Sequence, residues 1–67
     1  MSPYQQRIAT LVPDVNPLHV EAWMRDQHGT LDGLSPQQFS HEVHDAAILA
    51  RANPDLSESL ANSIGLV

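Results

Sequence analysis

Residues 35–54 read SPQQFSHEVHDAAILARANP and carry the clearest helix signals of the chain. Ser35 precedes a proline, so its side chain can cap a helix whose first residue lacks the N–H group that would be unpaired there. Gln38 stands three residues later and completes the pattern of a capping box. The stretch ends on the same kind of signal, an asparagine followed by proline, which forces a sharp turn. These features predict a helix over residues 36–52.

The dipeptide of a polar residue and proline occurs four times, at Ser2-Pro3, Asn16-Pro17, Ser35-Pro36 and Asn53-Pro54. Each predicts an N-cap and a helix start, and glutamine three residues after Ser2 adds a second capping box. The other helices are predicted over about residues 3–12, 17–28 and 54–64. Nothing alternates with the period of a strand. The sequence therefore predicts an all-α fold, a compact orthogonal bundle of four short helices in a single domain over residues 1–67.

Apolar residues gather on one face of each predicted helix at about 100° per residue. The faces comprise Tyr4, Ile8, Leu11 and Val12; Val20, Trp23 and Met24; Phe39, Val43, Ala46, Ala47, Leu49 and Ala50; and Leu56, Leu60 and Ile64. We expect these faces to form the core. Trp23 has two interpretations, as a core residue or as an exposed anchor for a partner. Gly29 should stop the second helix, and Leu31 and Leu34 should tuck under the domain.

Several polar side chains have local structural roles in this interpretation. Glu21 and Arg25 stand four residues apart in the favourable order for a helical ion pair. His28 falls in the last turn of the second helix, where a protonated imidazole complements the helix dipole. Asp32 lies between a leucine and a glycine, so its side-chain acceptor is expected to shape a turn.

The composition of the chain narrows the classes of function that we expect for it. The chain has 67 residues, no cysteine and no lysine, and its formal net charge is −5. Such a short chain buries only about 60% of the surface of its unfolded state, so a second copy of the chain is a candidate source of further stability. The acidic charge disfavours nucleic acid and anionic membranes as partners. Without a signal peptide or an apolar run of about 20 residues, we expect a cytoplasmic protein.

Residues 41–45 read HEVHD and place two histidines and two carboxylates within about one helical turn. The zinc-protease pattern needs two residues between its glutamate and its second histidine, and only one is present. His41 and His44 could still share a metal with a third ligand from elsewhere. The candidates for it are Asp45, His28 and His19. Both histidines of the pair lie opposite Phe39 on the helix, which favours ordinary surface histidines, so no metal and no other cofactor is predicted.

Ile48 shares this outer face with the two histidines and Arg51. An apolar centre with a polar rim that contains arginine has the composition of a protein interface. Two interpretations remain open for Ile48: it is exposed at the centre of a contact patch, or it packs against the first or last helix. The predicted partner-binding residues are His41, His44, Ile48 and Arg51.

The chain contains no nucleophile elbow and no phosphate-binding glycine loop, so an enzyme is not predicted. The leading hypothesis is a protein–protein interaction module, an adaptor or modulator of a larger partner. A second hypothesis is a helix-turn-helix DNA-binding protein, with the predicted helix over residues 36–52 as the recognition helix. Its glutamines would meet bases, but only Arg51 on that helix could meet a phosphate. A third is an acidic inhibitor that competes with nucleic acid for a basic protein.

Overall fold

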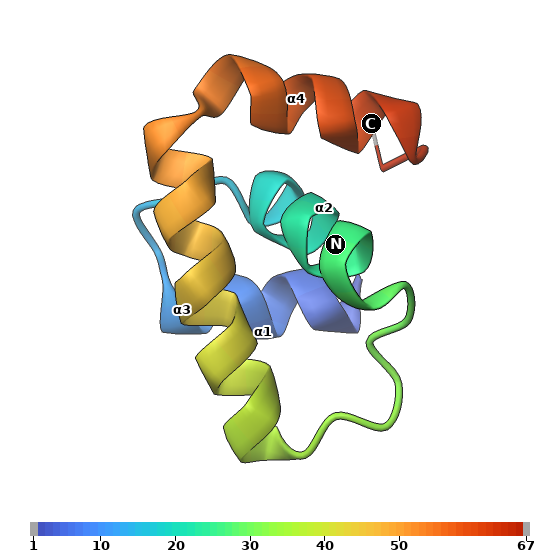
Figure 1. Ribbon diagram of the computed structural model, residues 1–67. Helices are drawn as coiled ribbons and strands as arrows, with labels where there is room; N and C mark the ends of the chain where they lie inside the picture. The colour runs from blue at the N-terminus through green and yellow to red at the C-terminus, as the bar shows by residue number, and fades with distance from the viewer. Residues whose placement is uncertain (1, 67) are drawn as a thin grey trace.

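Helices make up most of residues 2–66, the part of the chain that the computed structural model describes. This part contains α1 (Pro3–Leu11), α2 (Pro17–His28), α3 (Pro36–Ala52) and α4 (Pro54–Ser63), and it contains no strand. α2 lies between α1 and α4, and α4 leaves the C-terminal end of α3 at a steep angle and runs along α2 (Figure 1). The predicted all-α bundle of four short helices is confirmed.

Each helix begins at the predicted proline. At α3 the capping box is complete, because Ser35 Oγ accepts from Gln38 N at 3.1 Å and Gln38 Oε1 accepts from Ser35 N at 3.0 Å. At α1, Ser2 Oγ accepts from Gln5 N at 3.2 Å. The Gln5 side chain, however, donates to Glu21 Oε1 of α2 at 3.0 Å. The second predicted box is therefore only half formed, since a buried carboxylate takes the amide that would have closed it.

The two asparagines before proline behave differently from each other. Asn16 Oδ1 accepts from Leu18 N at 2.9 Å and caps α2 as predicted. Asn53 makes no side-chain cap for α4, and that prediction is wrong. Because Asn53 also ends α3, its side-chain amide donates to Leu49 O in the last turn of that helix at 3.1 Å.

Gly29 ends α2 at the predicted residue, with φ 75° and ψ −63°. Thr30 N donates to His28 O at 2.9 Å across this glycine, which makes a γ-turn whose geometry is strained for any residue with a Cβ atom. Gly65 follows α4 with φ 81°, and Leu66 N donates to a carbonyl of the last turn at 2.9 Å. This is the predicted folding back of the chain after α4.

The core consists mainly of aliphatic side chains around one phenylalanine. Its members are Ile8, Val12, Val20, Met24, Leu31, Phe39, Val43, Ala46, Ala47 and Ala50. Leu34 and Trp23 pack against this core while partly exposed. Leu11 was expected in the core but is 37% exposed at the end of α1. None of the helices within residues 2–66 is both long and apolar enough to span a bilayer.

Tyr4 ties α1 to the rest of the bundle. Its ring stacks on that of Phe39 with the centroids 6.0 Å apart, and its hydroxyl donates to Asp32 Oδ1 in the segment between α2 and α3. This hydrogen bond to a carboxylate raises the pKa of the Tyr4 hydroxyl. The prediction that the Asp32 acceptor shapes a local turn is wrong, because it bonds a helix distant in sequence.

Candidate interaction surface

The four predicted partner-binding residues lie on the outer face of α3. His41, His44, Ile48 and Arg51 follow one another at spacings of three or four residues, so their side chains project from the same side of the helix. All four are exposed, and Ile48 is 62% exposed. The alternative in which Ile48 packs against another helix is wrong, because α3 turns its opposite side, with Phe39, toward the core.

Both histidines of this face have local partners. His41 Nε2 lies 3.3 Å from Asp45 Oδ2, one turn along the helix, and both side chains are exposed. His44 Nδ1 lies 2.7 Å from Ser40 O. A carbonyl oxygen can only accept, so Nδ1 carries the hydrogen in this contact. The two imidazoles are therefore oriented by α3 itself. The other ring nitrogen of each imidazole is available to solvent or to another molecule.

Arg51 forms a bidentate ion pair with Asp14, which lies in the turn between α1 and α2. Its Nε donates to Asp14 Oδ2 at 2.8 Å and its Nη2 donates to Asp14 Oδ1 at 3.2 Å. The hydrogen bonds from the guanidinium lower the pKa of Asp14, and those to the carboxylate raise the pKa of Arg51. The pair fixes the C-terminal end of α3 against the α1–α2 corner.

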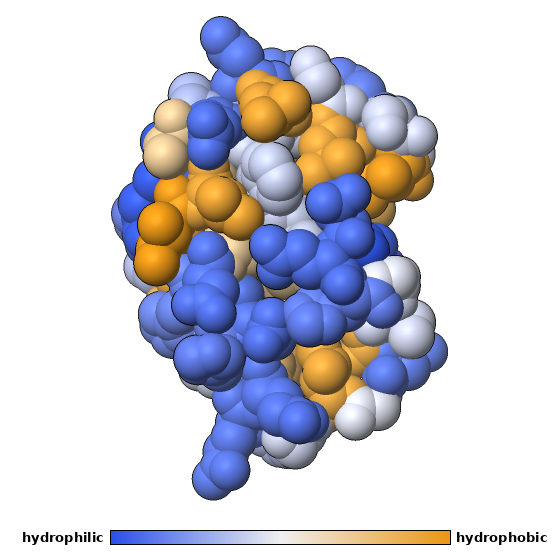
Figure 2. Space-filling view, in the orientation of Figure 1, coloured by the Kyte–Doolittle hydropathy of each residue, from blue (hydrophilic) through white to orange (hydrophobic). Residues whose placement is uncertain are grey.

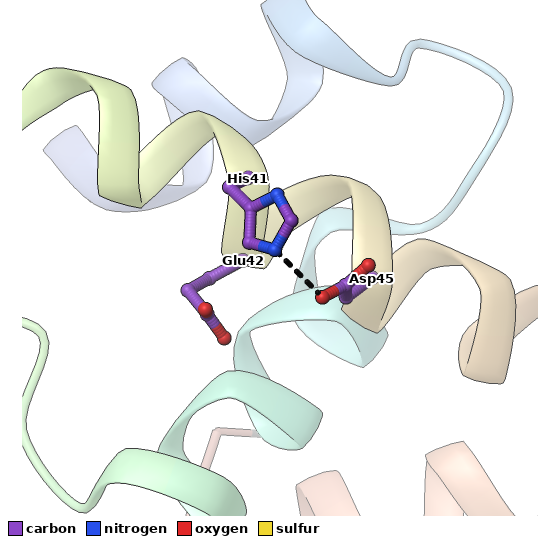
Figure 3. Close-up of side chains that lie close together, drawn as sticks. All are labelled: His41, Glu42 and Asp45. Carbon is purple, nitrogen blue, oxygen red and sulfur yellow. Dashed lines mark ion pairs between the residues drawn. The ribbon is translucent and has the colours of Figure 1, made fainter.

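Metal-ligating side chains on α3 form a group that differs from the pair of His41 and His44. His41, Glu42 and Asp45 have ligand atoms within 4.8 Å of one another, and His44 does not belong to the group. Figure 3 shows His41 facing Asp45, while Glu42 leaves the helix in another direction. Glu42 Oε2 lies 2.5 Å from Nε2 of His28 at the end of α2. The proximity of these three side chains is explained by two pairs, His41 with Asp45 along α3 and Glu42 with His28 across α3 and α2.

The apolar row of α4 is the feature that the sequence pattern misplaced. Leu56, Leu60 and Ile64 were expected in the core, but Leu56 is 55% exposed and Ile64 is 41% exposed. The buried residues of α4 are instead Ser57 and Ala61, both at 0% exposure. Small residues four positions apart allow two helices to approach closely. The spacing of Ser57 and Ala61 was therefore the signal in the sequence that could have identified the face of α4 that packs on the bundle.

A hydrogen-bond relay holds this small face of α4 on α2. Trp23 Nε1 donates to Ser57 Oγ at 2.7 Å, and Ser57 Oγ donates to Asn53 O at 2.6 Å. A half-buried indole N–H needs an acceptor, and the buried serine supplies it. Trp23 therefore serves the packing of α4 and is only partly exposed.

Comparisons with protein-family models, with curated proteins and with solved structures return no match. No pocket opens among residues 2–66. The exposed large aliphatic side chains of the described residues include Ile48 on the outer face of α3 and Leu56 and Ile64 of the apolar row of α4.

Proposed function

We propose that this chain is a non-catalytic protein–protein interaction module that docks on a larger partner through the outer face of α3. The observation that carries the proposal is Ile48, a large aliphatic side chain that is 62% exposed between polar residues. His41, His44 and Arg51 surround it in sequence as a polar rim. Their contacts with Asp45, Ser40 and Asp14 order them in advance, which lowers the entropy lost on binding.

The proposal predicts that Ile48 is needed for capture of a partner and dispensable for folding. We would place a photo-crosslinking amino acid at position 52, an exposed alanine one helical turn after Ile48 that is not among the predicted contact residues, and compare the protein with Ile48→Ser and with the control Leu11→Ser. Leu11 is also an exposed aliphatic residue but lies on α1. The expected result is one discrete crosslinked protein that is lost in Ile48→Ser and kept in Leu11→Ser, with circular dichroism unchanged in both. Equal crosslinking by both variants, or none by any protein, would contradict the proposal.

Two alternatives have less support. For a helix-turn-helix DNA-binding protein, the basic residue of the recognition helix is Arg51, and it is held by Asp14. The amide oxygen of Gln38, a candidate for base contacts, caps α3. For an acidic inhibitor that mimics nucleic acid, a dense negative stripe would be needed, whereas Glu21 and Glu42 are occupied by other side chains. A salt-dependent retardation of duplex DNA would favour the first alternative over our proposal.

A further inference from the structure

Three neighbouring side chains of α3, called here the α3 ligand group, are His41, Glu42 and Asp45. Their ligand atoms lie within 4.8 Å of one another. Asp45 follows His41 by four residues and Glu42 by three, so it is a neighbour of both on the helix surface. Figure 2 shows mainly hydrophilic surface over the N-terminal half of α3, and His41 and Asp45 are exposed. An ion can therefore reach the group from solvent.

The distance between His41 and Asp45 suits a shared metal ion. Nε2 of His41 lies 3.3 Å from Oδ2 of Asp45, and Figure 3 shows the imidazole facing the carboxylate. An N–H···O hydrogen bond is shorter, at about 2.7–3.2 Å between the heavy atoms. Two ligands of one tetrahedral ion with bonds of about 2.0–2.1 Å lie about 3.3–3.4 Å apart. The pair is thus already at the spacing of two zinc ligands.

Glu42 is the third ligand of the group, and α2 supplies the residue that orients it. Glu42 Oε2 lies 2.5 Å from Nε2 of His28, and because a carboxylate only accepts, the imidazole donates. Carboxylates that bind a metal are commonly held by such a hydrogen bond on one side. This leaves Oε1 of Glu42 as the oxygen that turns to the ion. It has to approach the other two ligands by at most about 1.5 Å, which rotation of a partly exposed side chain provides.

The ligand types select the ion. An imidazole with two carboxylates is a ligand set of Zn²⁺, whereas Ca²⁺ and Mg²⁺ take oxygen ligands. The net charge of −5 attracts a cation to the chain. We propose that His41, Glu42 and Asp45 bind one Zn²⁺ ion, that water completes its coordination, and that His28 positions Glu42. The site shares His41 with the outer face of α3 but requires neither Ile48 nor a partner protein, so it goes beyond the proposed function.

The test adds Zn²⁺ to the full chain, prepared without a histidine tag. Titration calorimetry measures the affinity and the number of ions bound, and imidazole chemical shifts show which histidines respond. The expected result is one saturable site per chain, with the largest shift at His41 and a smaller one at His28. Excess Mg²⁺ should not displace the ion, because Mg²⁺ prefers oxygen ligands and retains its water.

Variants locate the site. His41→Ala and Asp45→Ala should each weaken Zn²⁺ binding by more than about tenfold, since even the loss of a residue that orients a ligand costs about 10–100-fold. His28→Ala should weaken it by about tenfold for that reason. His44→Ala and His19→Ala are the matched controls and should leave the affinity unchanged, because neither residue belongs to the group. Circular dichroism checks that each variant is folded.

Three outcomes would overturn the inference. Binding that does not saturate, or no binding, would show that the group is only a set of paired side chains. A loss of affinity with His44→Ala as large as that with His41→Ala would place the ion between these two histidines instead. Equal small losses in all the histidine variants would indicate unspecific binding to exposed imidazoles. None of these outcomes bears on the crosslinking at position 52, so the proposed function stands or fails separately.

Discussion

Replacing Ser57 with alanine should loosen α4 from the bundle without removing any apolar contact. Ser57 Oγ is fully buried and accepts the indole N–H of Trp23 at 2.7 Å. In the variant this N–H loses its acceptor. The carbonyl of Asn53, to which Ser57 Oγ donates, keeps a partner because Ser57 N donates to it at 2.9 Å. The cost therefore comes from the indole alone.

The size of the effect depends on the exposure of Trp23. An unsatisfied buried donor costs about 1–3 kcal/mol, and because Trp23 is only half-buried, water can recover part of this, which leaves about 1–2 kcal/mol. A core of this size supplies only about 3–5 kcal/mol. The loss is thus a large fraction of the total, and at about 4–8 °C per kcal/mol the Tm should fall by roughly 5–15 °C.

Urea unfolding followed by circular dichroism measures the change in free energy. Ser59→Ala is the matched control, because Ser59 lies on the same helix but is exposed, and both variants gain the same helix propensity. In a Trp23→Phe background the donor is already absent, so Ser57→Ala should then cost little. If Ser57→Ala and Ser59→Ala have equal stability, or if the cost of Ser57→Ala persists with phenylalanine at position 23, the bond does not fix α4.

Three further changes test other contacts. Arg25→Met should lower the unfolding free energy in urea by about 1–3 kcal/mol, because Glu21 is 2% exposed and would lose the cation at 2.8 Å; a loss no larger than that of an exposed helical pair would contradict this. The pKa of Asp14 lies below its unfolded value of 3.8, so the pair with Arg51 stabilises the fold above that pH and its contribution is lost as the pH falls through the lowered folded pKa. The difference in stability between the protein and Arg51→Gln should accordingly be present at about pH 5 and shrink as the pH falls below 3.8, and a constant difference would refute it. Gly29→Ala should cost about 1–3 kcal/mol, since φ is 75° and nothing within 4 Å would contact the new Cβ atom, so that only backbone strain contributes; thermal unfolding of the variant at or above the parent Tm would exclude that strain.

The helices could be predicted because their signals are local. Ser35 and Gln38 cap α3 through bonds to residues three positions away, and Gly29 ends α2 through its own backbone. Such contacts depend on few neighbours, so the sequence contains nearly all the information. At Asn53 the same dipeptide failed as a side-chain cap, because the residue serves the end of α3 as well.

Contacts between distant residues could not be predicted in the same way. A helical wheel orders Leu56, Leu60 and Ile64 into a row but does not say which row faces the core when a second candidate face is present. Ser57 and Ala61 form that second face, and Ser57 also accepts the hydrogen bond of the Trp23 indole, a contact between residues far apart in the sequence. The exposure of the outer face of α3 was easier to predict, since the opposite face of that helix was clearly more apolar.

The orientation of α4 depends on two stabilising contributions of similar size. Full burial of a fully exposed leucine or isoleucine side chain contributes about 1.5–3 kcal/mol. Turning the helix to bury Leu56 and Ile64 would contribute proportionately less for each, because these side chains are only 55% and 41% exposed. The bond from Trp23 to Ser57 contributes about 1 kcal/mol net, but breaking it leaves a costly orphan donor. The sharp turn at Asn53 and the close approach allowed by Ser57 add to the observed orientation. The margin between the two is small, and these two local features decide which face of α4 is buried.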